Sequence, residues 1–343
     1  MSQHTSPLTR HRLAMVIVSM VLVLLICIFF ASTNGAGTIP LRVLFYPADA
    51  SEAQRIILFD IRIPRVLIAG LIGGALAVAG VVFQALLRNP LADPYVLGIS
   101  GGASIGGVLA LVSGIGATAG LLDNLTVPIF AFVGALGALF LIERIATVDG
   151  RLSVYTVLLT GVIFNAFAGA LIYFIQSIAS LEQLHDIVFY LMGRIPSLDE
   201  GKLLALAIFI TISTLALIAM SRDYNALSLG EEGAANLGVD VNRLKRRTFI
   251  LGSLLTGICV AFAGLIGFVG LVVPHILRLI HGPDHRLLLP TAFLGGGSFL
   301  ILADLFARIV ITPGELPVGV VTALVGGPFF LYLLRKRGRI HGI

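Results

Sequence analysis

The feature that most constrains this chain is a series of long apolar runs that carry no charge. The first run, Leu13–Ser32, contains twenty residues without a charged side chain. A helix of that length rises roughly 30 Å, which matches the hydrocarbon core of a bilayer. Its small final residues, Ala31 and Ser32, resemble a signal-peptide cleavage site, but the run exceeds a usual signal core and more runs follow. We therefore expect an uncleaved membrane-spanning helix.

Nine further apolar segments have the length or the setting of a membrane span. They cover about residues 64–87, 95–113, 126–146, 152–176, 203–220, 248–267, 270–281, 287–310 and 316–334. The segment at 270–281 is the weakest, because it is short and contains Pro274. Ten spans fill the chain, so we expect an all-α integral membrane protein in which residues 1–343 form a single transmembrane domain.

The composition supports lipid as the natural solvent of the chain. Apolar residues make up 57% of it and charged residues only 12%, against about 25% charged residues in soluble proteins. Its two cysteines, Cys27 and Cys259, lie inside apolar runs, which argues against a structural disulfide or a Cys-rich metal site. Small residues are spaced four apart at Gly70/Gly74, Gly98/Gly102 and Gly102/Gly106. Such spacing predicts closely packed helices.

Basic residues are distributed unevenly between the two sides that ten spans define. With the N-terminus in the cytoplasm, sixteen of the 23 Lys and Arg residues fall in inside segments and seven in outside segments. Cytoplasmic loops carry such an excess. We therefore predict that both termini and the segment Ser221–Arg247 are cytoplasmic. Because the basic residues sit at loop ends, the net charge of +5 does not indicate nucleic-acid binding.

The most polar connection is Ser221–Arg247, which carries nine charges between two apolar runs. Asn225–Leu237 has the composition of a short helix with its two glutamates exposed. Gly238 ends that helix, and a second short helix is expected over Asp240–Arg246. Two short helices in such a loop suggest a surface that holds a partner, although a solvated connector is the simpler interpretation.

Few side chains are candidates for chemistry. The chain has no Walker A, HExxH or CxxC pattern. His275, His281 and His285 lie near the inner face, but a Gly-Pro step interrupts their helix, so loop histidines are favoured over a metal site. Asp304 is the one acidic residue well inside an apolar run, with Arg308 four residues later. An ion pair near the outer surface is the simpler interpretation, and a proton relay is the functional alternative.

Arginines and a proline-rich turn mark the ends of the spans. Arg62 and Arg65 share a helix face at the outer end of the second span, with Arg308 at a similar level. We expect an outward-facing positive knob, which either reaches lipid phosphate or docks an acidic partner. On the inner face, Arg88–Pro94 forms a stiff turn that is either a gate or merely a turn. Asn165 either lines a polar path or ties two helices together.

Seven motifs follow one another along the chain. They are RIPR, QALLRNPLADPYVLGISGGA, GEEGAANLGV, GFVGLVVPHILRL, DHRLLLP, LADLFAR and GELPVGVVTALVGGPFFLYLL. Their combination, from about Arg62 to Leu334, resembles the FecCD family, the permease subunits of ABC importers for iron–siderophore complexes, haem and cobalamin. The resemblance implies the type II ABC importer permease fold with ten transmembrane helices. It also implies no catalytic activity and no cofactor in this chain, because partner subunits bind ATP and Mg²⁺.

The resemblance implies several partners. They are a second copy of the chain, two ATP-binding subunits at the cytoplasmic face, an extracytoplasmic substrate-binding protein and the lipid of the inner cell membrane. The translocation path would run between the two copies, lined mainly by the spans at 152–176 and 316–334. The implied ATPase-coupling residues are Leu229, Gly230, Glu231, Glu232, Ala234, Ala235, Leu237 and Gly238. The implied binding-protein docking residues are Arg62, Arg65 and Arg308.

The resemblance also implies a gate at the inner face. Asn89 and Leu91 match its first half. Ser153 and Tyr155 match the second half, with Asn165 on the path beyond, but this turn is less small and polar than in some cobalamin relatives. That difference favours an iron complex, either a siderophore or haem, over cobalamin as the transported substrate.

Two functions from other classes compete with an importer permease. An ion-coupled secondary transporter would use Asp304 as its coupling carboxylate, but it would leave Ser221–Arg247 without a role. An intramembrane enzyme would need a paired nucleophile and base, or a metal cluster, within the spans, and the sequence offers neither.

Overall fold

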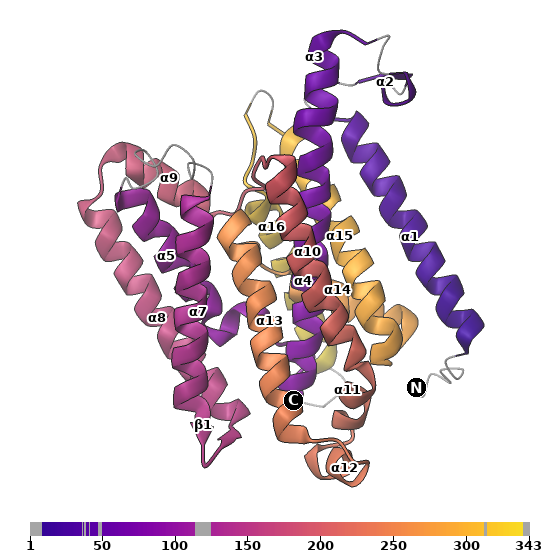
Figure 1. The fold of residues 1–343 in the computed structure, drawn as a ribbon, viewed down its shortest axis with the longest axis vertical. Coiled ribbons are helices and arrows are strands. Elements are labelled where there is room, and N and C mark those ends of the chain that lie inside the picture. Colours follow the sequence, from indigo (N-terminus) through magenta and orange to yellow (C-terminus); the bar gives the residue numbers. More distant parts are fainter. Residues whose placement is uncertain are drawn as a thin grey trace.

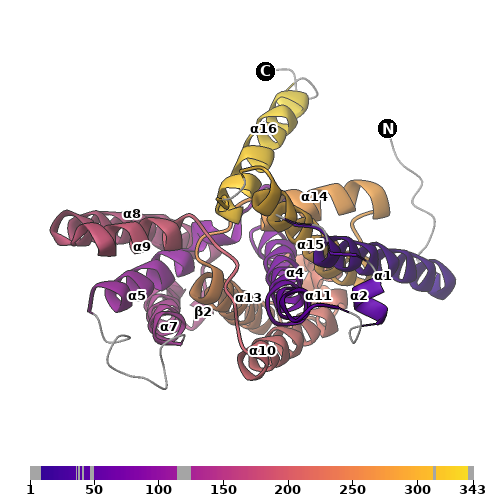
Figure 2. The same cartoon turned by 90° about the horizontal axis from the view of Figure 1, so that it is seen from above.

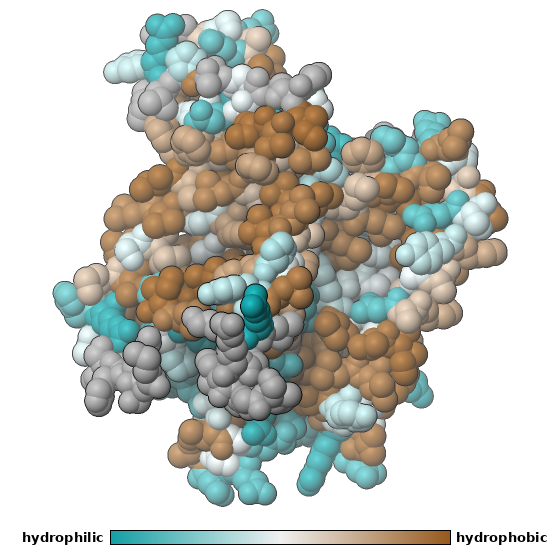
Figure 3. All heavy atoms as spheres, turned by 180° about the vertical axis from the view of Figure 1, so that it is seen from behind, coloured by the Kyte–Doolittle hydropathy of each residue, from teal (hydrophilic) through white to brown (hydrophobic). Residues whose placement is uncertain are grey.

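The computed structural model describes residues 9–35, 37, 39–40, 42–46, 50–113, 125–311 and 314–338. In this part of the chain, seven helices are long and apolar enough to cross a membrane, and three shorter apolar helices accompany them. Figure 3 shows apolar side chains mostly across the middle of one face and hydrophilic ones mostly toward the two ends. The predicted all-helical membrane protein is therefore confirmed.

Short connections join the helices, and a single pair of two-residue strands is the only sheet among the described residues. The elements are α1 (Arg10–Thr33), α2 (Arg42–Phe45), α3 (Glu52–Arg55), the π-helix η2 (Ile56–Arg62), α4 (Ile63–Leu86), the 3₁₀-helix η3 (Pro94–Leu97), α5 (Ile99–Ser113), α7 (Thr126–Ala146), β1 (Thr147–Val148), β2 (Arg151–Leu152), α8 (Val154–Ile178), α9 (Leu181–Leu191), α10 (Glu200–Ala219), α11 (Ser221–Leu227), α12 (Glu231–Asn236), α13 (Val241–Ala263), α14 (Val269–His281), α15 (His285–Ile309) and α16 (Val318–Gly338).

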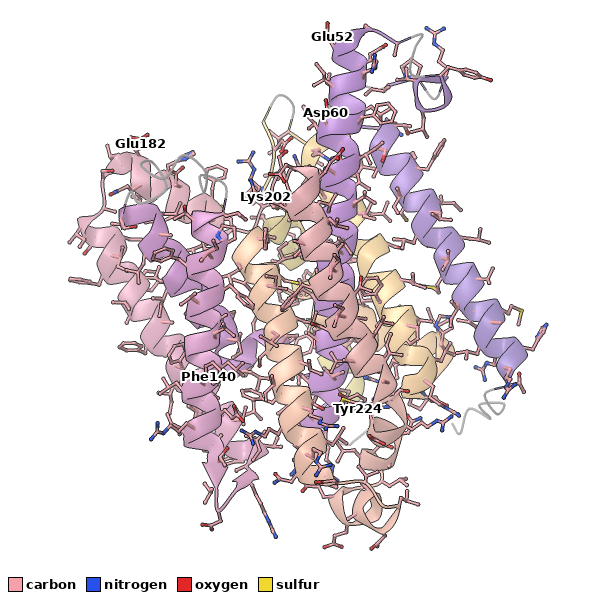
Figure 4. The ribbon with its side chains drawn as sticks, viewed as in Figure 1. Glu52, Asp60, Phe140, Glu182, Lys202 and Tyr224 are labelled. Carbon is pink, nitrogen blue, oxygen red and sulfur yellow. The ribbon has the colours of Figure 1, made fainter. Side chains whose placement is uncertain are left out.

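The helices run along a common axis, with α4 at the centre (Figure 1). We call the end that bears α12 the α12 face, and the end that bears α3 the α3 face. Seen from above, α5, α7, α8 and α9 form one group, while α16 stands out from another side of the molecule (Figure 2). Figure 4 shows Glu52, Asp60, Glu182 and Lys202 toward the α3 face and Tyr224 toward the α12 face.

The second apolar helix begins earlier than the sequence predicted. Instead of starting near residue 64, it runs without a break from Glu52 to Leu86 through α3, η2 and α4. A capping box at Ser51 explains the early start, because its side chain accepts from the Gln54 backbone N–H while the Gln54 side chain accepts from the Ser51 N–H. The helix therefore projects at the α3 face (Figure 1).

The region around residues 221–264 also departs from the prediction. The expected helix over 225–237 is broken at Gly230, whose φ of +103° suits glycine, so that α11 and α12 are separate. The expected short helix over 240–246 and the span at 248–267 are one continuous helix, α13. Asp240 caps its start by accepting from the Arg243 N–H, and Gly264, with φ +69°, ends it.

Glycines allow the helices to approach at backbone distance. Gly73 of α4 and Gly296 of α15 face each other so closely that a Cβ on either would overlap the carbonyl oxygen of the other. The same holds for Gly102 of α5 and Gly134 of α7, and a Cβ on Gly106 would overlap a carbonyl of α7. The close packing predicted from the glycine spacing in the third span is confirmed.

Candidate sites for coupling, gating and docking

The coupling segment, residues 229–238, projects from the α12 face (Figure 1). Leu229 and Leu237 are 70% and 64% exposed there. Of the eight predicted coupling residues, Gly230 is half-buried and Ala234 is fully buried, so these two support the segment rather than face a partner. The other six are exposed. These two leucines are therefore the candidate apolar anchors for a partner in this segment.

The two glutamates of the coupling segment differ in their surroundings. The carboxylate of Glu231 pairs with the Lys245 ammonium of α13 at 2.6 Å, which holds α12 against α13. Within the described residues, Glu232 makes no ion pair and is exposed. Glu232 is therefore the glutamate that is free to meet a partner, a difference that the adjacent sequence positions do not reveal.

Side-chain hydrogen bonds anchor the coupling segment to the bundle through α11. Tyr224 is fully buried, and its hydroxyl lies 2.9 Å from that of Thr248 in α13. Because Thr248 donates its own proton to a backbone carbonyl, Tyr224 is the donor. The Asn225 amide donates to Asp284 at 2.8 Å, and its oxygen accepts from the backbone N–H of His285 at 2.8 Å. A displacement of α11 therefore acts directly on α13 and on the start of α15.

The start of α13 is also bonded to the strand pair that leads into α8. The Asn242 side chain accepts from the Leu152 N–H at 3.1 Å and donates to the Gly150 carbonyl at 3.0 Å. Ser153, which directly follows Leu152, caps α8 because its side chain accepts from the Thr156 N–H at 3.3 Å. The strand pair, which the sequence did not predict, thus connects the coupling segment with a predicted path helix.

A side-chain hydrogen bond lies within the predicted gate turn. The Asn89 side-chain oxygen accepts from the Leu91 N–H at 3.0 Å, and the turn begins at Arg88, whose φ is +49°. The other predicted half lies at the start of α8, where Tyr155 is 76% exposed. No hydrogen bond joins the two halves among the described residues.

Asn165 ties two elements together in this structure. Its amide donates to the Tyr95 carbonyl in η3 at 2.7 Å, and it is half-buried. The Tyr95 hydroxyl in turn donates to the Ile266 carbonyl and accepts from the Ile266 N–H, both at 3.0 Å. Tyr95, which the sequence analysis did not single out, therefore joins the gate turn, α8 and the connection between α13 and α14.

The three predicted docking arginines do not form an outward-facing knob in this structure. Arg62 and Arg308 are only 8% and 5% exposed. Arg62 donates to the carbonyl of Thr33 at 3.2 Å, and Arg308 donates to that of Ala31 at 3.2 Å. Desolvating a guanidinium is costly unless its donors are satisfied, and these carbonyls satisfy some of them. Their role in docking stays a prediction.

Arg65 and Arg308 share one buried carboxylate. Asp304 is fully buried, with Arg65 Nη2 at 2.9 Å from its Oδ1 and Arg308 Nε at 3.0 Å from its Oδ2. Arg65 also contacts Glu315, the 43%-exposed acid before α16, at 2.8 Å. The predicted pair of Asp304 and Arg308 is present, and Arg65 makes it a triad. Flanked by two guanidiniums, this carboxylate has the setting of a structural counter-charge rather than of a proton relay.

The histidines near the α12 face lie at separate positions. His275 is buried within α14, His281 ends that helix and His285 begins α15. In the described part of the chain, no three His, Cys, Asp or Glu side chains gather closely enough to hold a metal ion.

The bundle and its candidate sites define a class of protein: a multi-pass helical membrane subunit with an exposed polar segment at one end and buried arginines at the other. The chain belongs to the FecCD transport family, which matches residues 19–336. It is therefore an ABC importer permease, a multi-pass membrane protein that moves substrate and is not itself an enzyme. The family resemblance seen in the motifs is confirmed.

Known proteins resemble the chain over most of its length. The cobalamin import system permease protein BtuC of Halobacterium salinarum is 42% identical over 286 residues, which cover 83% of this chain and 75% of that protein. The hemin transport system permease protein HmuU of Yersinia pestis is 38% identical over 325 residues, which cover 94% and 96%. An inward-facing transporter assigned to the metal-chelate type of ABC transporter superposes with a TM-score of 0.81 at 30% identity, covering 94% of this chain and 99% of that one. The fold is that of a type II ABC importer permease.

Proposed function

We propose that two copies of this chain form a homodimeric permease that imports an iron complex, either a siderophore or haem, by alternating access. Each copy would contribute ten spans, with both termini and the α12 face in the cytoplasm. Two ATPase subunits would bind the coupling segments, and a substrate-binding protein would dock at the α3 face. The observation that carries this proposal is the projecting coupling segment with its exposed Leu229 and Leu237.

The hydrogen bonds at the α12 face supply a route from ATPase movement to the path. A displacement of α12 would be transmitted to α13 through the ion pair between Glu231 and Lys245. From there it reaches the strand pair through Asn242, and the strand pair leads into α8. The permease needs no covalent chemistry in this scheme. It needs only two arrangements of its helices whose relative stability the ATPase and the binding protein change.

The surfaces of α8 and α16 suit a bulky chelate. The sequence of α8 contains no charged residue. Large apolar or aromatic side chains project from both helices, including Phe167, Tyr173 and Phe174 of α8 and Leu324 and Tyr332 of α16. A path of this kind offers contact area without strong binding sites, so a large substrate is released rather than trapped.

The substrate class rests on two observations. The hemin permease aligns with 94% of this chain, and the compared structure is of the metal-chelate type. Tyr155 of the second gate half is bulky and 76% exposed. Both favour an iron complex, and cobalamin is the alternative because a cobalamin permease is 42% identical.

Uptake by the reconstituted complex tests the proposal. The chain, its partner ATPase and its binding protein are placed in proteoliposomes, and ATP-dependent uptake of a ferric siderophore, haem and cobalamin is compared. We expect uptake of an iron complex and little uptake of cobalamin. Uptake of cobalamin alone would reject the substrate class, and uptake that needs a proton gradient but no ATP would reject the importer.

A further inference from the structure

The connection between α13 and α14 is a stretch of five residues, 264–268, that forms no helix. We call it the α13–α14 connector. It starts at Gly264, whose φ is +69°, and ends at Phe268, whose φ is +68°. The left-handed conformation is costly for a residue such as phenylalanine, so it persists only where neighbouring groups hold it in place. The connector is therefore a segment that its surroundings must fix.

The connector lies at membrane depth. The helix that follows it, α14, leads toward the α12 face, where Asn225 of α11 is bonded to the start of α15. This helix has 13 residues, which rise about 20 Å and do not cross the roughly 30 Å of hydrocarbon. Non-helical backbone at such a depth must find its hydrogen-bond partners inside the protein. Ile266, in the middle of the connector, is only 2% exposed.

The hydroxyl of Tyr95 supplies the partners that Ile266 needs. It accepts from the Ile266 N–H at 3.0 Å and donates to the Ile266 carbonyl at 3.0 Å. In an α-helix, both groups would bond to residues four positions away. A phenol takes the place of those partners here, because it is a donor and an acceptor at once. A phenylalanine ring would fill the same space and form neither bond.

Tyr95 is itself bonded to the gate turn and to α8. Its backbone N–H donates to the Asp93 carboxylate at 2.8 Å, and its carbonyl accepts from the Asn165 amide at 2.7 Å. A second bridge lies nearby, because the Gln84 side-chain nitrogen donates to a carbonyl of the turn at 3.4 Å and to the Gly270 carbonyl of α14 at 3.2 Å. The gate turn is therefore bonded to the connector through Tyr95 and to α14 through Gln84.

The connector also packs against α16, the second predicted path helix. A Cβ on Gly319 would lie 2.6 Å from the Leu265 carbonyl oxygen, and a Cβ on Gly326 would overlap the Phe268 side chain. Because packed groups at such distances transmit displacements, a shift of the connector acts on α16. The connector thus joins the gate turn, through Tyr95, to a helix that is predicted to line the path.

We propose that Tyr95 is a positioning residue of the permease. Its hydroxyl fixes the connector to the gate turn, so that the gate turn and the adjoining part of α16 shift together when the path changes its accessibility. The role of the gate turn rests on the proposed function, whereas the link between Tyr95 and the connector does not.

Hydrogen exchange of the purified full-length chain in nanodiscs tests the link. Y95F removes both bonds to Ile266 and keeps the ring. The matched control Y190F removes another tyrosine hydroxyl bond near the end of α13, the one to the Val260 carbonyl at 3.2 Å. Since a hydrogen bond is worth up to about a tenfold change in an equilibrium, we expect residues 262–270 to exchange about tenfold faster in Y95F, and residues 88–97 to exchange faster as well. Y190F should leave residues 88–97 at the native rate. Equal rates in these residues for Y95F and Y190F would overturn the inference.

Exchange in the complex with the partner ATPase separates positioning from a merely structural role. When ATP and vanadate trap the closed ATPase, residues 88–97 and 262–270 of the native chain should change their exchange rates together. In Y95F, the change at residues 88–97 should persist and the change at residues 262–270 should be lost. A Y95F complex in which both segments respond as in the native chain would overturn the positioning role.

The two experiments distinguish failure of this inference from failure of the proposed function. If trapping changes neither segment in the native complex, the proposed gate is wrong, and the comparison without nucleotide still decides whether Tyr95 fixes the connector. Should Y95F not assemble, N165A is compared with Y190F, because it releases the Tyr95 carbonyl from α8. Faster exchange of both segments in N165A supports the link, and unchanged exchange at residues 262–270 overturns it.

Discussion

At the scale of single residues, one cluster of charged groups near the α3 face is arranged around Asp304. Its carboxylate lies between two guanidiniums, and each guanidinium has a further partner in a carbonyl or in Glu315. The sequence predicted the pair Asp304–Arg308 from its spacing of four. It could not predict Arg65, because a contact over 239 residues has no local signal.

Replacing Asp304 by Asn should destabilise the chain by about 3–5 kcal/mol, since Arg308 would then be buried without its counter-charge. The double variant D304N/R308Q should recover part of that loss. Thermal and denaturant unfolding of the purified chain measure both effects. A fully stable D304N protein that no longer supports uptake would instead point to a proton relay.

Glu315 forms an ion pair with Arg65, one of the arginines on which the binding protein is expected to dock. If an acidic side chain of that protein docks on Arg65, it must compete with Glu315. We therefore expect E315Q to tighten binding of the substrate-binding protein by about twofold to fivefold, the range of a partly exposed ion pair. Surface plasmon resonance on nanodisc-embedded chain measures this, with E182Q of α9 as an exposed acidic control. Unchanged or weaker binding by E315Q would argue against Arg65 as the docking cation.

At the scale of elements, hydropathy located every apolar helix, but it placed several boundaries wrongly. Hydrophobic runs predicted residues 126–146 to the residue, and the strand pair follows that helix directly. The helix start at Glu52 was missed, since a capping box at Ser51 initiates the helix within polar sequence. The start of α13 was expected near Asp240, but its continuity with the apolar run from residue 248 was not. Apolar content in the sequence therefore predicts which part of a helix lies in lipid, whereas capping residues predict where the helix begins.

Helix packing offers a test with two neighbouring glycines of α7. A Cβ on Gly134 would overlap the backbone carbonyl of Gly102, whereas a Cβ on Gly137 would meet nothing within 4 Å. We expect G134A to lower the free energy of unfolding by about 1–3 kcal/mol through overpacking. G137A should be neutral or stabilising by up to about 1 kcal/mol, because alanine favours the helix. Equal effects of the two variants on thermal unfolding would show that α5 and α7 do not meet at backbone distance.

The candidate sites could be predicted from the sequence only in part, because local sequence shows where polar residues interrupt the apolar runs but not which residues meet in the fold. The region of the coupling segment stood out because Ser221–Arg247 carries nine charges between two apolar runs, and its position at one end of the molecule follows from that. The sequence did not predict how this region divides into α11 and α12. The break at Gly230 and the pairing of Glu231 with Lys245 depend on tertiary contacts.

At the scale of the whole molecule, packed helices join the two ends at which the candidate sites lie. Hydrogen bonds link α11 to α13 and α15 and link α13 to the strand pair before α8, while the triad at the α3 face joins α4 to α15. A helix such as α15 therefore contacts elements at both ends. This continuity is what a permease needs if events at one face are to change the other.

Binding of the partner ATPase to the purified chain is the most direct test of the coupling segment. The variant L229S/L237S removes its two exposed leucines, and L181S removes an 88%-exposed leucine from α9 at the other end. Because buried apolar anchors dominate interface energies, we expect the double variant to weaken ATPase binding about tenfold or more. The native chain and L181S should bind equally well. ATPase binding by L229S/L237S at native affinity would contradict the assignment of this segment as the coupling site.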